Sequence, residues 1–414
     1  ELTITPIVDS FLETSYSWQI NGEDISNELT CTLPTIELGE YQVRFATHNE
    51  DGDDEVTFKV EVCSPDQVDF NWTFLQTEYN MSAGRTIRIK PVDVNNALDA
   101  VYTWTVDNEQ VQSGENDTYL FTSEQQGEHT VKVEMKNSYI LATQTLKVNV
   151  CPPAGTYQRK ISATSSASMN KVYEYLPAPG QFINENHNTI TMAEACTYAE
   201  ERINQTAYVS LGGFGGYIIV GFDHSIVNDG DYNIAITGNA FDGSSEPGIV
   251  WVMQDENGDG LPNDTWYELR GSEYGKAETW QDYAVTYHKP TGIQLPTPWT
   301  DNHGQSGSID YLGAFHRQDY YYPAWVKEKQ YTLRGTRLKE RNYDQSGNGT
   351  YWVNDSYEWG YADNFSAIDR LTDDDNYNAG PSDNHFKISH AVTFDGKDAN
   401  LKYIDFIKVQ VGVN

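Results

Sequence analysis

Residues 16–21 read Tyr-Ser-Trp-Gln-Ile-Asn, and residues 102–107 read Tyr-Thr-Trp-Thr-Val-Asp. Each stretch alternates apolar and polar side chains, which is the period of a β-strand with one buried face. A buried Trp on a central strand is common in β-sandwiches, so we expect Trp18 and Trp104 to pack in a core. The pattern therefore predicts the same β-sandwich twice.

Two further blocks repeat in the same order. The first reads Gly-Glu-Tyr-Gln-Val-Arg at residues 39–44 and Gly-Glu-His-Thr-Val-Lys at 127–132. The second reads Thr-Phe-Lys-Val-Glu-Val-Cys at 57–63 and Thr-Leu-Lys-Val-Asn-Val-Cys at 145–151. Three ordered matches indicate a duplication, and we predict β-sandwich domains at residues 1–63 and 64–151.

The remainder of the chain, residues 152–414, predicts a third and larger domain. Strand-like runs alternate there with turns rich in Gly, Asn and Asp, and eight or more such runs are typical of a jelly roll. Residues 191–203 begin with Thr-x-x-Glu and continue with good helix formers, which predicts one helix. The predicted fold class is therefore all-β, with two immunoglobulin-like sandwiches followed by a jelly-roll-like domain that carries one helix.

Charge and composition exclude several classes of partner. The chain of 414 residues has 27 Lys and Arg against 61 Asp and Glu, a net charge of −34. Such a chain repels nucleic acid and anionic lipid headgroups, so we expect neither as a partner. No stretch of eighteen apolar residues occurs, so we predict no transmembrane segment. Because the chain begins at Glu1 without Met, we expect a processed leader or lipid anchor before it.

An acidic loop lies between two strand-like runs at residues 249–253 and 266–270. Oxygen-bearing side chains occupy alternate positions, Gly260 follows where the chain must turn, and such an order suits a calcium ion. The twelfth position is Trp266, so the closing Glu of an EF-hand is missing. The alternative is a solvated acidic turn. We predict a structural Ca²⁺ bound by Asp255, Asn257, Asp259, the carbonyl of Leu261, and Asp264, with Glu268 as the alternative source of the last oxygens.

Aromatic residues gather in two loop-like segments of the third domain. A flat aromatic side chain beside an amide or carboxylate suits a ring-shaped polar ligand, because the side chain stacks on the ligand and the polar group fixes the ligand's orientation. The alternative is that these rings fill a wide β-core. The predicted ligand-binding residues are Tyr320, Tyr321, Tyr322, Trp325, Trp359, Tyr361, Asp363 and Asn364.

Enzymatic activity is not expected. The sequence has no His-Glu-x-x-His, no Gly-x-Ser-x-Gly and no Cys/His signature. The Gly-rich run at residues 212–216 precedes a strand and has no following Lys, so it is not a phosphate-binding loop. With 61 acidic residues, no carboxylate pair stands out as that of a glycosidase.

Two resemblances add to this interpretation. The repeated Trp, Gly-Glu and Thr-x-Lys-Val blocks resemble PKD-type domains of bacterial surface proteins. The segments 209–224, 238–250, 259–269, 359–364 and 403–410 resemble surface lipoproteins of gut Bacteroidetes. The second resemblance implies a protein at the cell surface, anchored to the outer membrane, that assists nutrient uptake beside a transporter.

That resemblance also bears on the ligand. Some proteins of this kind accompany corrinoid transporters, so it implies a corrinoid of the vitamin B12 type as the favoured ligand. A glycan is the alternative, since aromatic β-sandwiches bind sugars by stacking. A third reading is a structural adhesin that binds no small molecule.

Overall fold

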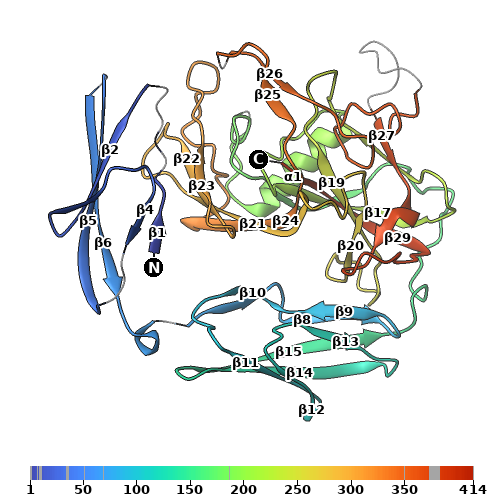
Figure 1. Ribbon diagram of the computed structural model, residues 1–414. Helices are drawn as coiled ribbons and strands as arrows, with labels where there is room; N and C mark the ends of the chain where they lie inside the picture. Colours follow the sequence, from blue (N-terminus) through green and yellow to red (C-terminus); the bar gives the residue numbers. More distant parts are fainter. Residues whose placement is uncertain are drawn as a thin grey trace. The chain divides into compact units, whose positions relative to one another are not determined.

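The structure is a computed structural model, and it describes residues 2–6, 8, 12–33, 37–50, 52–68, 70–185, 187–348, 350–372 and 383–413. Its regular structure is almost entirely β-strand, with one α-helix in the described part of the chain (Figure 1). The predicted all-β class is therefore confirmed. The chain divides into two compact units: Glu1–Thr77, Ile89–Tyr119 and Thr130–Leu146 form the first, and Glu78–Arg88, Leu120–His129 and Lys147–Asn414 the second.

The N-terminal sandwich belongs to the first unit. Its strands are β1 (Leu2–Ile4), β2 (Ser15–Ile20), β3 (Glu23–Ser26), β4 (Cys31–Leu33), β5 (Gly39–Asn49) and β6 (Gly52–Val62). The larger sheet has the order β3-β2-β5-β6, and β1 pairs with β4. Trp18 on β2 is fully buried, with its ring centroid 4.6 Å from that of Phe45 on β5. Trp18 thus takes the core position expected of it.

The next sandwich repeats this arrangement. Its strands are β7 (Trp72–Phe74), β8 (Glu78–Ser82), β9 (Thr86–Ile89), β10 (Pro91–Val94), β11 (Val101–Val106), β12 (Glu109–Gly114), β13 (Tyr119–Thr122), β14 (Gly127–Lys136) and β15 (Leu141–Cys151). Its main sheet has the order β12-β11-β14-β15-β8, and β8 runs parallel to β15. Trp104 is fully buried, as expected.

The duplication extends to single hydrogen bonds. Asn21 donates its backbone N–H to the Gln42 carbonyl at 2.8 Å, and its side-chain oxygen accepts from the Gln42 N–H at 2.8 Å. Asp107 makes the same two bonds with Thr130, at 3.0 and 2.9 Å. Asn21 and Asp107 both adopt positive φ, 50° and 49°, which Asn and Asp tolerate in hairpin turns. The turn chemistry of the two repeats is therefore the same.

The C-terminal domain lies in the second unit and has two main sheets. Its strands are β16 (Lys171–Leu176), β17 (Tyr217–Val227), β18 (Ile234–Thr237), β19 (Gly248–Met253), β20 (Trp266–Leu269), β21 (Trp280–His288), β22 (Thr297–Asp301), β23 (Ser306–Ile309), β24 (Gln330–Arg337), β25 (Asn342–Asp344), β26 (Trp352–Asn354), β27 (Asp383–Phe386), β28 (Ala391–Val392) and β29 (Tyr403–Val411). One sheet has the order β16-β17-β29-β19-β20-β28, the other β23-β22-β21-β24.

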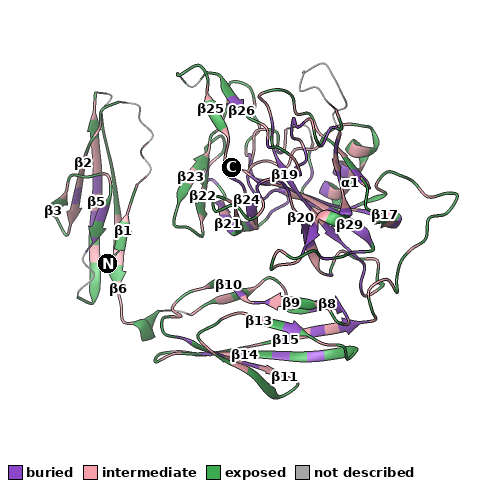
Figure 2. Cartoon of the chain, turned by 45° about the vertical axis from the view of Figure 1, so that its right-hand side comes forward, coloured by how far each residue is buried: buried purple, intermediate pink, exposed green. Residues whose placement is uncertain are grey.

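A shared core makes these two sheets a sandwich. It includes Ile218 from the first sheet, Tyr283 and Leu333 from the second, and Ala195 and Ala199 from the helix. The central strands β19 and β29 are mostly buried (Figure 2). Strands buried on both faces read as continuous apolar runs, and β19 is such a run. β29 is not, because it also carries Asp405, Lys408 and Gln410.

Helix α1 (Met192–Asn204) matches the predicted helix. Thr191 is its N-cap: its hydroxyl accepts from the Glu194 N–H at 3.3 Å, and the Glu194 carboxylate accepts from the Thr191 N–H at 3.1 Å. This is the reciprocal capping box that Thr-x-x-Glu predicts. Among the described residues, no helix is both long and apolar enough to cross a membrane.

Candidate functional site

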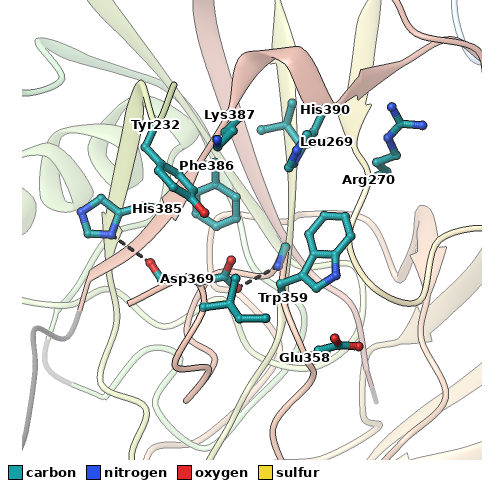
Figure 3. Close-up of a pocket in the computed structure, with 12 residues that line it drawn as sticks. Tyr232, Leu269, Arg270, Glu358, Trp359, Asp369, His385, Phe386, Lys387 and His390 are labelled. Carbon is teal, nitrogen blue, oxygen red and sulfur yellow. Dashed lines mark hydrogen bonds between the residues drawn. The ribbon is translucent and has the colours of Figure 1, made fainter. Parts of the chain in front are cut away.

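A pocket of about 340 Å³ opens at one end of strands β20 and β27 in the C-terminal domain (Figure 3). Leu269 and Arg270 come from β20 and the residue after it, and Phe386 comes from the end of β27. The full lining is Tyr232, Leu269, Arg270, Glu358, Trp359, Gly360, Ile368, Asp369, His385, Phe386, Lys387 and His390. Short loops and strand ends thus supply most of its polar groups.

Aromatic rings form part of the pocket wall. Trp359 is half-buried, and the His390 ring meets it edge-on with centroids 5.2 Å apart. Tyr232 lies beneath the Lys387 ammonium, whose nitrogen is 4.6 Å from the ring centroid. Burial, together with Arg270 and Lys387 nearby, lowers the pKa of His390, so its imidazole is neutral at pH 7. The ring that packs against Trp359 is therefore uncharged.

Asp369 is the buried carboxyl group of the pocket. It is 3% exposed, and its Oδ2 accepts from the Gly360 N–H at 2.8 Å. Burial raises its pKa to about 7, against the opposing effect of backbone hydrogen bonds. The His385 Nδ1 lies 2.9 Å from the Asp369 carbonyl, which can only accept, so Nδ1 carries the proton (Figure 3). The Nε2 of neutral His385 is then an acceptor.

Most of the cationic charge in the pocket is already paired. Arg270 forms an ion pair with Asp398, and the Lys387 nitrogen lies 4.0 Å from Asp231. Glu358 is exposed at the pocket rim. The pocket thus offers several hydrogen-bond acceptors beside one indole, which suits a ring-shaped ligand bearing hydroxyl groups.

Four of the predicted ligand-binding rings are buried in the core. Tyr321, Tyr322, Trp325 and Tyr361 are 2%, 1%, 6% and 2% exposed. Trp325 donates its indole N–H to the Tyr175 carbonyl at 3.1 Å, and the Tyr322 hydroxyl donates to the Glu328 carbonyl at 2.9 Å. The structure corrects the expectation here: these rings present no open face for stacking, because they are packed inside the domain. Tyr322 and Trp325 lie in the core between the sheets, and Tyr361 lies in a separate cluster.

The remaining predicted residues have separate positions. Tyr320 is half-buried, with the Lys289 ammonium 5.4 Å from its ring centroid. Asp363 uses one oxygen to accept from the Asn239 and Ala240 N–H groups at 2.6 and 2.7 Å. Asn364 is fully buried and accepts from the Tyr357 N–H at 2.8 Å. Asp363 and Asn364 hold turns together, and of the eight predicted residues Trp359 alone lines the described pocket.

Sequence reasoning missed the other polar pocket residues. His385, Lys387 and His390 fall within a short segment around β27, and their density in a chain with 9 His was a usable signal. Arg270 and Asp369 gave no such signal, because they reach the pocket only through strand pairing and a loop.

The predicted calcium loop is closely hydrogen-bonded. Asp255 accepts from the Gly258 and Gly260 N–H groups at 2.7 and 3.0 Å. One oxygen of Asp259 accepts from the Leu261 N–H at 2.7 Å, and the other from the Asn257 side chain at 2.9 Å. Leu261 itself is exposed, and its carbonyl accepts from the Asn263 N–H at 3.0 Å. Most of the proposed ligand oxygens therefore have partners within the protein.

Asp264 differs from the rest of the loop. It is 4% exposed, and its Oδ2 accepts from the Glu256 N–H at 3.0 Å, while its Oδ1 has no hydrogen-bond partner among the described residues. Burial, with smaller contributions from Glu256, Asp255 and Asp259, raises its pKa to about 8 against the lowering effect of that hydrogen bond. Over the described ranges, no three His, Cys, Asp or Glu side chains converge as a metal site would require. The buried Oδ1 of Asp264 favours a bound cation, but the arrangement of the other predicted ligand oxygens does not. The calcium site stays a prediction.

Comparison with known proteins identifies one segment of the chain. Residues 74–137 match the PKD-like domain family. The matched segment lies in the second of the two sandwiches, so that sandwich is similar to PKD-like domains. The match does not extend to the C-terminal domain. Among curated proteins, none matches the sequence.

Solved structures resemble the chain only distantly. Fibronectin(III)-like modules of CbhA from Clostridium thermocellum are 16% identical over 39% of this chain and 90% of theirs, with a TM-score of 0.19. The FN1–FN3 domains of chicken CNTN1 are 11% identical over 80% of this chain and 81% of theirs, also with a TM-score of 0.19. Carbohydrate-binding modules of the β-sandwich superfamily are 9% identical over 64% of this chain and 89% of theirs, with a TM-score of 0.16. Scores this low carry no functional argument.

Proposed function

We propose that this protein binds glycans without transforming them, and that the pocket beside Trp359 holds one sugar ring. The observation that carries the proposal is a half-buried indole in a pocket whose other walls present Glu358, Asp369 and His385. A pyranose has an apolar face that stacks on an indole and a rim of hydroxyl groups that donate to such acceptors. Protein pockets for small ligands begin at about 300 Å³, so a single ring is the appropriate size.

Pocket size favours the glycan over the corrinoid that the sequence resemblance implies. A corrinoid is a macrocycle with an attached nucleotide, several times larger than one sugar ring. A pocket of about 340 Å³ could enclose only a fraction of it. The pocket therefore supports the glycan, and the corrinoid becomes an alternative outcome of the test.

The pocket lining includes two carboxyl groups, Asp369 and Glu358, and binding without catalysis is supported by how the buried one is held. A glycosidase of the usual kind needs two carboxyl groups on either side of the scissile bond. Asp369 instead has Oδ2 engaged by the Gly360 N–H and is almost wholly buried. A carboxyl group held in this way is better placed to orient a hydroxyl group of a bound sugar than to attack the sugar as a nucleophile.

Location and partners remain part of the same proposal. A net charge of −34 suits a protein that faces an aqueous medium. We accordingly propose a cell-surface protein anchored to an outer membrane, with a structural Ca²⁺ in the loop 255–264, that delivers its ligand to an outer-membrane transporter.

The first experiment compares Trp359→Ala with the wild type in native gels containing galactomannan, laminarin, soluble starch or polygalacturonic acid. We expect at least one polysaccharide to retard the wild type, and the variant to bind it about tenfold more weakly, a loss of about 1.4 kcal/mol. Trp352→Ala is the matched control, because Trp352 on β26 is 56% exposed and lies outside the pocket lining.

Each other outcome would point elsewhere. Equal retardation of Trp359→Ala and the wild type would show that the sugar binds away from this pocket. A spectral change of cobalamin on mixing, without retardation in any gel, would favour the corrinoid. Hydrolysis of a retained polysaccharide that ceases in Asp369→Asn would make the protein an enzyme. If neither ligand binds, the adhesin reading remains.

A further inference from the structure

Arg85 is rigidly held in the PKD-like domain. It follows the turn between β8 and β9, where Gly84 has a φ of 81° and donates its N–H to the Ser123 carbonyl at 2.9 Å. The Arg85 N–H donates to the Ser82 carbonyl at 3.1 Å, and the Arg85 carbonyl accepts from the Thr122 hydroxyl at 2.9 Å. Its side chain therefore leaves from a fixed point. Residues 78–88 belong to the same compact unit as the whole C-terminal domain.

The Arg85 side chain reaches into the C-terminal domain. Its Nη1 donates to the Ala399 carbonyl at 2.8 Å, and its guanidinium carbon lies 5.5 Å from the ring centroid of Tyr267 on β20. Its Nε lies 3.5 Å from Oε1 of Glu256, and the two side chains are 19% and 1% exposed. A planar guanidinium can serve an acceptor, a ring and a carboxylate at once, which a Lys ammonium cannot.

Glu256 makes this contact energetically important. Its side chain is 1% exposed, and the Arg85 guanidinium is the cation that faces it. Its Oε2 accepts from the Ser82 N–H at 3.2 Å, so both of its oxygens face the PKD-like domain. Removing Arg85 would leave this carboxylate buried without a counter-charge, and such a loss is strongly destabilising.

Two of the residues that Arg85 contacts, Tyr267 and Ala399, lie close in the chain to residues that line the pocket or pair with its lining. Tyr267 lies two residues before Leu269 on β20, and both Leu269 and Arg270 line the pocket. Ala399 follows Asp398, the ion-pair partner of Arg270. The Ala399 N–H donates to the Ala391 carbonyl at 2.8 Å, and the Arg270 N–H donates to the His390 carbonyl at 3.1 Å. One wall of the pocket thus rests on residues that Arg85 touches.

We propose that Arg85 is a positioning residue for the pocket, and that the segment 78–88 is a structural part of the pocket's support. Arg85 fixes β20 and the 398–399 segment, and these hold Arg270, Asp398 and His390 in place. The ligand-binding part of this inference rests on the glycan function proposed above. The positioning part does not, because it concerns the order of the pocket wall in the unliganded protein.

The test measures hydrogen exchange of the full chain carrying Arg85→Met, which keeps an apolar stem but removes the charge. We expect peptides covering residues 266–272 and 388–400 to exchange about tenfold faster than in the wild type, through local opening. Peptides covering β21 and β24, in the other sheet, should keep their wild-type rates. Arg85→Lys should give an intermediate effect, and it serves as the readout if Arg85→Met does not fold.

Arg88→Ala is the matched control. Arg88 lies in the same segment, and its Nη2 lies 3.1 Å from Asp282, but both side chains are substantially exposed. An exposed pair contributes little, so this variant should leave both pocket peptides unchanged. In the polysaccharide gels, Arg85→Met should bind about threefold to tenfold more weakly than Arg88→Ala.

Two results would overturn the proposal. One is wild-type exchange of both pocket peptides in folded Arg85→Met protein, and the other is equal acceleration across both sheets, which would indicate general destabilisation. If the wild type binds no polysaccharide, the glycan function fails, while accelerated exchange confined to the pocket wall would still support the positioning role.

Discussion

At Asp264, burial outweighs every other influence on the side chain. The carboxyl group has one hydrogen bond, from the Glu256 N–H, while three acidic neighbours face it. Its pKa of about 8 means that the folded protein holds a proton at neutral pH that the unfolded chain has released. The contribution of this group to the free energy of unfolding is therefore fully present below about pH 4 and is lost as the pH rises towards 8.

Asp264→Asn should remove this dependence. In EDTA at pH 8 we expect the variant to be more stable than the wild type by about 1–3 kcal/mol, because an amide carries no charge to bury. Below pH 4 the two proteins should have nearly equal stability. Urea unfolding between pH 4 and pH 8 gives both values. A parallel fall of stability with pH in the two proteins would contradict the assignment.

At the scale of elements, strands β19 and β20 and the loop between them serve two purposes. The strands pair through Trp251, Val252 and Met253, and β20 continues into the pocket wall. The loop carries Glu256, which meets the PKD-like domain, and the acidic side chains of the predicted calcium site. A change in the loop should therefore reach both the domain contact and the pocket.

Calcium should stabilise the protein through this loop. If an ion binds, Asp264 loses its proton and its unpartnered oxygen gains a ligand bond, so the folded state is favoured by about 2.7 kcal/mol at a concentration one hundred times the Kd. We expect the Tm at pH 7.5 to be several degrees higher in 5 mM CaCl₂ than in EDTA. Asp264→Asn should lose this response, and magnesium should not reproduce it. An unchanged Tm in calcium would show that the loop binds no ion.

At the scale of the whole molecule, the negative charge opposes compactness. A net charge of −34 repels itself, and salt reduces repulsion between exposed charges beyond about 10 Å at 0.1 M. In EDTA we expect the Tm to rise by a few degrees between 10 and 200 mM NaCl. KCl should act equally, since screening does not depend on the cation. A Tm that falls with salt would mean that surface ion pairs outweigh the repulsion.

Much of the architecture was readable from local patterns. The alternation around Trp18 and Trp104 and the Thr-x-x-Glu capping box act over a few residues, so the sequence alone indicated the two repeats and helix α1. Strands β25 and β26 have three residues each, and β22 and β23 have five and four, so each has only a weak local pattern. β22 and β23 pair with each other, as do β25 and β26, whereas β16 pairs with β17, which follows helix α1 in the chain.

By itself the sequence determined the all-β class, the duplication and the single helix, since hydrophobic period and turn chemistry are local properties. Only the tertiary structure decided which aromatic rings are exposed. Tyr322 and Trp359 both lie in aromatic, loop-like segments of the sequence, yet Tyr322 fills the core between two sheets and Trp359 lines a pocket. Burial depends on what the opposite sheet and distant loops bring to each ring, as with Arg85 and Glu256, which are 171 residues apart in the chain (256 − 85).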